Sequence, residues 1–159
     1  MQRNQDSKTA PGTHRGHVLL VSPNTFSYHL SIADTLRSMG YAVTWWDDRA
    51  QTSTWYKLAI RLFPTFTVRW SERAYLDRLQ QLDPTSISHV LVVKGEGLSR
   101  RVVSEMRKTL VSASFGLYLW DGVANVKGVS TILSAFDSVA TFDPMDANTF
   151  GWTFRPLFG

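Results

Sequence analysis

The stretch FGLYLWDG, residues 115–122, decides the fold predicted for this chain. Its short apolar run ends abruptly in Trp120, Asp121 and a glycine, which is typical of a buried parallel strand that stops at a polar carboxyl end. In open α/β sheets, ligands bind outside the carboxyl ends of the strands. We therefore expect Trp120 and Asp121 to lie at a ligand-binding edge. The structural alternative is a core tryptophan beside an aspartate that caps the next turn.

Four further apolar runs end in the same way and alternate with helical patterns. They are VLLVSPN at 18–24, VTWWDDR at 43–49, VLVVKGEG at 90–97 and VATFDPMD at 139–146. This alternation predicts a single Rossmann-like α/β domain, with a mostly parallel sheet and helices on both faces. We expect about six strands in the order 2-1-3-4-5-6, with a switch point between the first and third strands.

The elements are expected at definite positions along the chain. Strands are predicted at residues 17–21, 41–46, 89–93, 115–119, 138–142 and 152–154. Helices are predicted at 28–39, 67–82, 126–135 and 144–150, from Ser53 or Thr54 to Pro64, and after Ser99. Gly40 stands where a glycine that ends a helix would.

The composition limits the classes of partner and cofactor. The chain has 159 residues, a formal net charge of +4 and no cysteine, so disulfides, thiolate metal sites and a cysteine nucleophile are excluded. The four histidines lack metal-ligand spacing, and we expect no metal. We expect residues 1–16 to be a disordered tail and 17–159 the domain. No window approaches a membrane helix, which favours a cytoplasmic protein with at most peripheral contact with the inner face of the membrane.

The loop after the first strand, SPNTF at residues 22–26, contains no glycine. A dinucleotide-binding turn needs glycines so that backbone amides can approach a pyrophosphate, and NAD or FAD is therefore not expected. A response-regulator site needs an acidic pair at this position, and the loop has none. We expect Thr25 or Ser27 to cap the following helix, with Asn24 and Phe26 lining a cleft.

The turn after the third strand carries the second candidate feature. Gly95 and Gly97 can expose backbone amides at a helix start, and Lys94 adds a positive charge, so the turn is a candidate anion site. Glu96 is a candidate general base, since burial would raise its pKa. The structural alternative is a tight turn closed by a Lys94–Glu96 ion pair.

Two further strand ends carry acids. Asp48 and Arg49 follow the second strand and form either an internal ion pair or a ligand contact. Asp143 follows the fifth strand, where a helix cap is the structural alternative to ligand binding. Aromatic residues interleaved with arginines at 55–73 are better explained by helix packing than by nucleic-acid binding.

Several segments together resemble a known family. They are HVLLVSPNTFSYHLSIADTLRSMGYAVTWWDDRA, VVKGEGLSRRVVSEMRK, YLWDGVANV, FDSVATFDPMDANTFG and FRPLF, and they span residues 17–158. They are similar to the N-terminal half of bacterial lipopolysaccharide- and capsule-biosynthesis proteins, which are glycosyltransferase-like and related to the spore-maturation glycosyltransferases.

The resemblance implies the acceptor-side half of a GT-B glycosyltransferase, which binds a glycan or a lipid-linked acceptor. Glu96 or Asp121 would act as the base toward an acceptor hydroxyl, with Trp120 stacking on a sugar ring. A sugar nucleotide would bind only if a second, donor-binding half completed the site, so transfer of a hexosyl or related sugar by this chain alone is not expected.

Two other functions remain open at this point. One is a non-catalytic module that binds a nucleotide or sugar or forms a homo-oligomer. The other is a small nucleotide hydrolase, for which the KGEG turn is the only candidate phosphate site.

Overall fold

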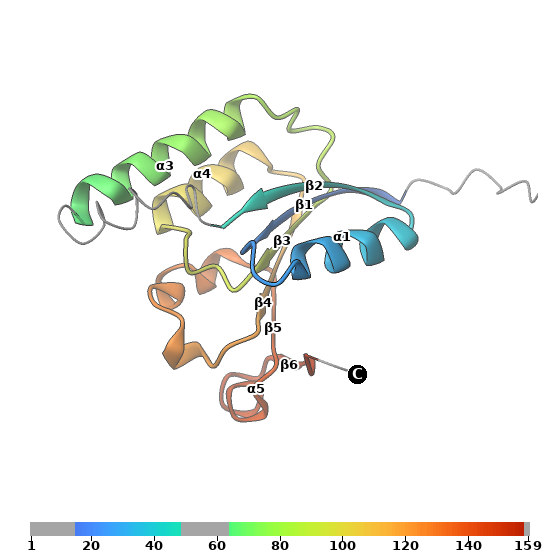
Figure 1. The fold of residues 1–159 in the computed structure, drawn as a ribbon, viewed down its shortest axis with the longest axis vertical. Coiled ribbons are helices and arrows are strands. Elements are labelled where there is room, and N and C mark those ends of the chain that lie inside the picture. The colour runs from blue at the N-terminus through green and yellow to red at the C-terminus, as the bar shows by residue number, and fades with distance from the viewer. Residues whose placement is uncertain (1–14, 49–63, 158–159) are drawn as a thin grey trace, which may run out of the picture.

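The computed structural model describes residues 15–48 and 64–157, which form one α/β domain around a six-stranded parallel sheet (Figure 1). The strand order is β2-β1-β3-β4-β5-β6, so the predicted order and the switch point between β1 and β3 are confirmed. The strands are β1 (Gly16–Ser22), β2 (Tyr41–Asp47), β3 (His89–Val93), β4 (Ser114–Leu119), β5 (Ser138–Thr141) and β6 (Thr153–Phe154).

Helices lie on both faces of the sheet, as predicted. Helix α1 (Tyr28–Ser38) lies on one face over β1 and β2, while α3 (Pro64–Gln80) and α4 (Arg100–Thr109) lie on the other (Figure 1). The short helix α5 (Pro144–Phe150) connects β5 to β6. Within the described residues, no helix is long and apolar enough to cross a bilayer.

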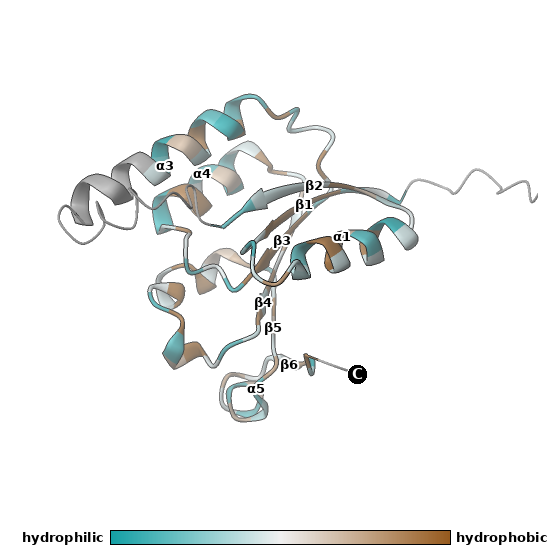
Figure 2. Ribbon diagram, viewed as in Figure 1, coloured by the Kyte–Doolittle hydropathy of each residue, from teal (hydrophilic) through white to brown (hydrophobic). Residues whose placement is uncertain are grey.

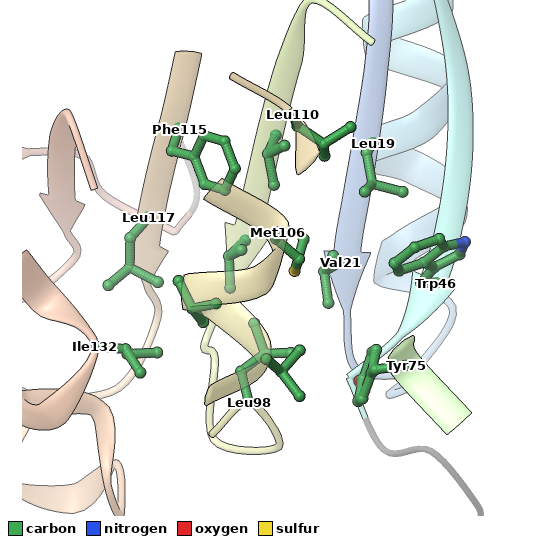
Figure 3. Packing of buried hydrophobic residues seen from close by; sticks show 14 of the residues in the cluster. Leu19, Val21, Trp46, Tyr75, Leu98, Met106, Leu110, Phe115, Leu117 and Ile132 are labelled. Carbon is green, nitrogen blue, oxygen red and sulfur yellow. The ribbon is translucent and has the colours of Figure 1, made fainter. Parts of the chain in front are cut away.

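The main core lies between the sheet and the α3–α4 layer. Leu19 and Val21 of β1 and Phe115 and Leu117 of β4 point into it and meet Met106 of α4 (Figure 3). In Figure 2, β1 and β3 are largely hydrophobic and β2 is neutral to hydrophilic, whereas the helices carry both kinds of residue. A smaller cluster lies on the α1 side of the sheet. Covering both faces explains why the strand sequences read as near-continuous apolar runs.

The helix predicted at 126–135 is wrong. That stretch forms two separate 3₁₀ turns, η2 (Val129–Thr131) and η3 (Leu133–Ala135), after a first turn η1 (Val123–Asn125). Gly128 has a φ of +76°, which a continuous right-handed helix cannot contain. The helix predicted at 67–82 instead runs from Pro64 to Gln80, and the one predicted between Ser53 and Pro64 lies outside the described residues.

Of three predicted helix ends, two are confirmed and one is wrong. Asp143 caps α5 by accepting hydrogen bonds from the amides of Met145 and Asp146. Gly40, with a φ of +91°, follows the end of α1 as predicted. The cap predicted at the start of α1 is wrong, because Ser27 has a φ of +59° and its side chain makes no capping hydrogen bond.

We expect Ser99→Ala to lower the free energy of unfolding by about 1–2 kcal/mol. The Ser99 hydroxyl accepts a hydrogen bond from the amide of Val102 at 3.3 Å and donates one to Glu72 Oε1 at 2.6 Å, which joins α4 to α3. Urea denaturation measures the loss, and Ser99→Thr should retain most of the stability. Ser112 is exposed and follows α4, and an equal loss for Ser112→Ala would contradict the capping role assigned to Ser99.

Candidate functional site

At the switch point between β1 and β3, the loops that follow the two strands at the carboxyl edge of the sheet separate. The chain leaves β1 toward α1 on one face and leaves β3 toward α4 on the other, so the two connecting loops diverge. A crevice at such a divergence is the usual ligand site of an open parallel sheet. The residues that follow β1, β3 and β4 are therefore the first candidates for a site.

An ion network joins the ends of β3 and β4. The Lys94 ammonium lies 3.0 Å from Glu96 Oε2 and 3.2 Å from Asp121 Oδ2. The predicted Lys94–Glu96 pair is confirmed, and Asp121 is added to it because β3 and β4 are neighbours in the sheet. Partial burial would lower the pKa of Lys94, but the hydrogen bonds and charges of Glu96 and Asp121 outweigh it and hold the pKa above its ordinary value.

The turn itself is closed by its own backbone. Lys94 and Gly95 both have positive φ angles, +69° and +73°. The amide of Lys94 donates to the carbonyl of Tyr118, and the amide of Gly95 donates to the carbonyl of Val93. One of the amides considered for an anion, that of Gly95, is therefore already bonded, and the Lys94 ammonium already bridges two carboxylates. We do not propose an anion here.

An aromatic row lies on the α1 side of this edge. The ring centroids of Phe26 and Tyr28 are 6.1 Å apart, and those of Tyr28 and Trp120 are 5.9 Å apart, both edge to face. Phe26 is 86% exposed and has a φ of +48°, uncommon for a bulky residue. Trp120 packs against the smaller cluster on the α1 side, so the alternative of a tryptophan that contributes to the core is partly confirmed.

A pocket of about 450 Å³ lies between α1 and β4. Helix α1 covers β1 and β2, and among the described helices none covers β4 on that side (Figure 1). Tyr118 of β4 and Trp120, which directly follows β4, therefore line open space beside the helix. The lining residues are Tyr28, Ser31, Ile32, Thr35 and Leu36 from α1, Tyr118 and Trp120 from the sheet, and Leu157 from the C-terminal segment.

The polar groups of this pocket are few. Tyr118 donates its hydroxyl to the carbonyl of Arg155 at 3.2 Å, which ties the C-terminal segment across β4. Burial raises the pKa of Tyr118, so the phenol stays protonated at neutral pH. Thr35 donates its hydroxyl to the carbonyl of Ser31 within the helix. The pocket therefore presents mainly apolar and aromatic surface.

The remaining predicted site residues are dispersed. Asn24 and Gly97 are exposed in their loops, and Asp143 is engaged as the α5 cap. Asp48 is 1% exposed, and its amide donates to the carbonyl of Ser22. Arg49 lies outside the described residues.

Sequence reasoning missed most of the pocket. Tyr28, Ile32 and Leu36 follow helical spacing, which indicated only a face that covers the sheet. Tyr118 was predicted only as part of a strand. Leu157 belonged to the FRPLF motif, but no role was predicted for it. The available signal was the aromatic pair at Tyr118 and Trp120, two residues apart and hence on one face of a strand.

Residues 15–48 and 64–157 contain no group of three histidine, aspartate or glutamate side chains placed to hold a metal ion.

We expect Lys94 to stabilise the fold below its folded-state pKa and to lose that effect as the pH rises through it. The pKa is raised above the unfolded value of 10.5, so the contribution is complete below about pH 10. The difference in unfolding free energy between the wild type and Lys94→Met should shrink as the pH rises beyond 10.5. Urea denaturation at pH 8 and pH 11 measures it, and an unchanged difference would contradict the ion network.

Solved structures that resemble this chain are receiver domains. The signal receiver domain of an HD domain-containing protein from Pseudomonas fluorescens Pf-5 is 13% identical, with a TM-score of 0.48 over 90% of this chain and 87% of that chain. A response regulator from Thermotoga maritima is 11% identical, with a TM-score of 0.47 over 86% of this chain and 96% of that chain. The isolated REC domain of RcsB from Salmonella enterica serovar Typhimurium is 12% identical, with a TM-score of 0.46 over 88% and 92%.

No family model and no curated protein matches the chain. The structural likenesses concern the order of strands and helices and assign no function to this chain. Ser22 at the end of β1 is fully buried, and its hydroxyl accepts a hydrogen bond from Trp45 Nε1 at 3.1 Å.

The glycosyltransferase resemblance is corrected by these comparisons. The similar structures are receiver domains and not halves of glycosyltransferases, and no polysaccharide-biosynthesis family matches. Sugar transfer, glycan or lipid-linked acceptors and sugar nucleotides are therefore not proposed further, nor are Glu96 and Asp121 as bases. The physical reason is visible in the site, because the motif residues Lys94, Glu96 and Asp121 bind one another and Asp143 caps a helix. Polar strand ends of this kind recur in parallel α/β sheets whatever they bind.

Proposed function

We propose that this domain binds a small, flat, largely apolar molecule in the pocket between α1 and β4. The observation that carries the proposal is the pocket itself, about 450 Å³ in volume and lined by three aromatic and three aliphatic side chains. Small-molecule sites in proteins are concave, mostly apolar spaces of about 300–1,000 Å³ with few polar groups. The domain thus acts as a binding module.

The position of the pocket also supports this proposal. Tyr28 begins α1 directly after the loop that leaves β1, and Trp120 follows the last residue of β4. One end of the pocket therefore lies at the carboxyl edge of the sheet, the edge at which open parallel sheets bind ligands. An aromatic ring placed there contacts Tyr28 and Trp120 edge to face or offset, a geometry that aromatic pairs favour. The cytoplasmic location expected from the sequence remains part of the proposal, and fractionation of cells producing the tagged protein tests it.

Ligand-observed NMR with a library of small aromatic compounds tests the proposal. We expect binding in the millimolar range or tighter, with amide shifts in Tyr28–Leu36 and Tyr118–Trp120. Ser31→Trp places an indole in the pocket from an exposed helix position and should weaken binding at least about tenfold. Ser38→Trp adds the same side chain to the same helix away from the pocket lining and should leave binding unchanged.

Two results would refute the proposal. One is a library in which no compound binds the wild-type domain. The other is binding that survives Ser31→Trp as well as it survives Ser38→Trp, since the ligand would then occupy another surface.

A further inference from the structure

The chain that follows β6 contributes one wall of the pocket. Residues 155–157, here called the wall segment, lie on the α1 side of the sheet (Figure 1). Leu157 is the one lining residue, among those that the structure describes, that belongs neither to α1 nor to β4 and its end. Because no described helix covers β4 on this side, the wall segment bounds a space that a covering helix would otherwise fill.

Two hydrogen bonds fix the start of the wall segment. The amide of Arg155 donates to the carbonyl of Thr141 in β5 at 2.8 Å, and the carbonyl of Arg155 accepts from the Tyr118 hydroxyl in β4 at 3.2 Å. Pro156 comes next, and its ring fixes its own φ at about −65° and keeps the preceding residue extended. The backbone that leads to Leu157 is therefore held by two strands and by the stereochemistry of proline.

The Leu157 side chain borders the pocket without belonging to the core. It is 41% exposed and is a member of neither hydrophobic core cluster. Substitutions at exposed positions usually change the free energy of unfolding by less than about 0.5 kcal/mol. A change of side chain at Leu157 should therefore alter the shape of the pocket and leave the fold nearly as stable as before.

We infer that Leu157 determines the size of the flat ligand that the pocket accepts, and that Tyr118 is the positioning residue that holds Leu157 in place. This inference rests on the proposed binding function and adds the residue that selects among ligands. A fixed wall discriminates by steric overlap with the larger of two similar ligands. Tyr118 acts through the wall segment, because its hydroxyl is bonded to the carbonyl of Arg155.

Two flat compounds that differ by one fused ring, quinoline and acridine, test the inference. Their dissociation constants are measured from amide chemical shifts at a pH at which both are neutral. We expect Leu157→Ala to raise the affinity for acridine relative to quinoline about five- to tenfold, and Leu157→Phe to lower this ratio. The control is Met145→Ala on α5, which removes a 77% exposed side chain outside the pocket lining and should leave the ratio unchanged.

Tyr118→Phe tests the positioning role, because it keeps the ring that lines the pocket and removes only the hydroxyl. It should shift the acridine-to-quinoline ratio in the same direction as Leu157→Ala, by roughly two- to fivefold. In the Leu157→Ala background it should add nothing further, since the side chain that it positions is already gone. A purely structural role of the hydroxyl would weaken the binding of both compounds alike and leave the ratio unchanged.

The failures of the inference and of the proposed function are distinguishable. Binding of quinoline or acridine with a ratio that neither Leu157 variant changes would overturn the inference and leave the proposed function intact. A Tyr118→Phe effect of full size in the Leu157→Ala background would remove Tyr118 as the positioning residue. If neither compound binds the wild type and no other aromatic compound does, the proposed function itself fails.

Discussion

Replacing Phe115 with alanine is expected to lower the free energy of unfolding by about 3–5 kcal/mol, the usual cost of removing a buried phenylalanine ring. Phe115 is 1% exposed and stands on the central strand β4, inside the main core (Figure 3). Its ring lies 6.4 Å from that of Phe136, and the guanidinium of Arg107 lies 4.4 Å from its centroid. The truncation therefore opens a cavity and removes an aromatic and a cation–π contact together.

Urea denaturation followed by circular dichroism measures this loss. Phe115→Leu keeps most of the buried volume and should cost markedly less. Val111→Ala is the surface control, since Val111 is 78% exposed, and it should change stability by less than about 0.5 kcal/mol. A Phe115→Ala loss as small as that of Val111→Ala would mean that β4 does not lie in the core.

Replacing Gly16 with alanine is expected to lower the free energy of unfolding by about 2–4 kcal/mol. Gly16 begins β1 with a φ of +134°, a conformation that residues with a side chain rarely adopt, and an added Cβ would lie 2.2 Å from Ser88 Oγ. That oxygen accepts a hydrogen bond from the amide of His17 and donates one to the carbonyl of the same residue. The methyl group therefore both strains the backbone and displaces the hydroxyl that joins β1 to the start of β3.

A double-mutant cycle separates the two causes. Ser88→Gly removes the hydroxyl, so Gly16→Ala should cost less in the Ser88→Gly background than in the wild type. Gly151→Ala is the matched control, because Gly151 also has a positive φ, +69°, but a Cβ added there would meet nothing within 4 Å. An equal cost for Gly16→Ala and Gly151→Ala would leave backbone strain as the only cause.

The sheet was predictable because each strand carries its own signal. A buried parallel strand needs apolar residues on both faces, so runs such as VLLV at 18–21 and VLVV at 90–93 are recognisable without their neighbours. The strand order followed from right-handed crossovers and the number of helical segments between strands. The predicted helix at 126–135 failed because the apolar residues there fit helical spacing, while Gly128 breaks the backbone into short turns.

The candidate site was predictable only in part. Lys94 and Glu96 are two residues apart, so their ion pair could be foreseen from spacing. Asp121 joins them across neighbouring strands, which requires the strand order as well. The family resemblance placed the same residues in a sugar-transfer site, although polar strand ends of parallel sheets serve many functions.

By itself the sequence determined the class of fold, the order of the strands and the polar edge at which they end, because these depend on local hydrophobic patterns and on crossover handedness. Only the tertiary structure decided that α1 leaves β4 uncovered on its side, and that Tyr28, Tyr118 and Leu157 meet there around one pocket. These residues are far apart in the sequence, and no local sequence pattern indicates which part of a sheet face a helix will leave uncovered. The FGLYLWDG stretch thus predicted its own strand, whereas the space beside Trp120 exists only through the position of a helix formed about ninety residues earlier.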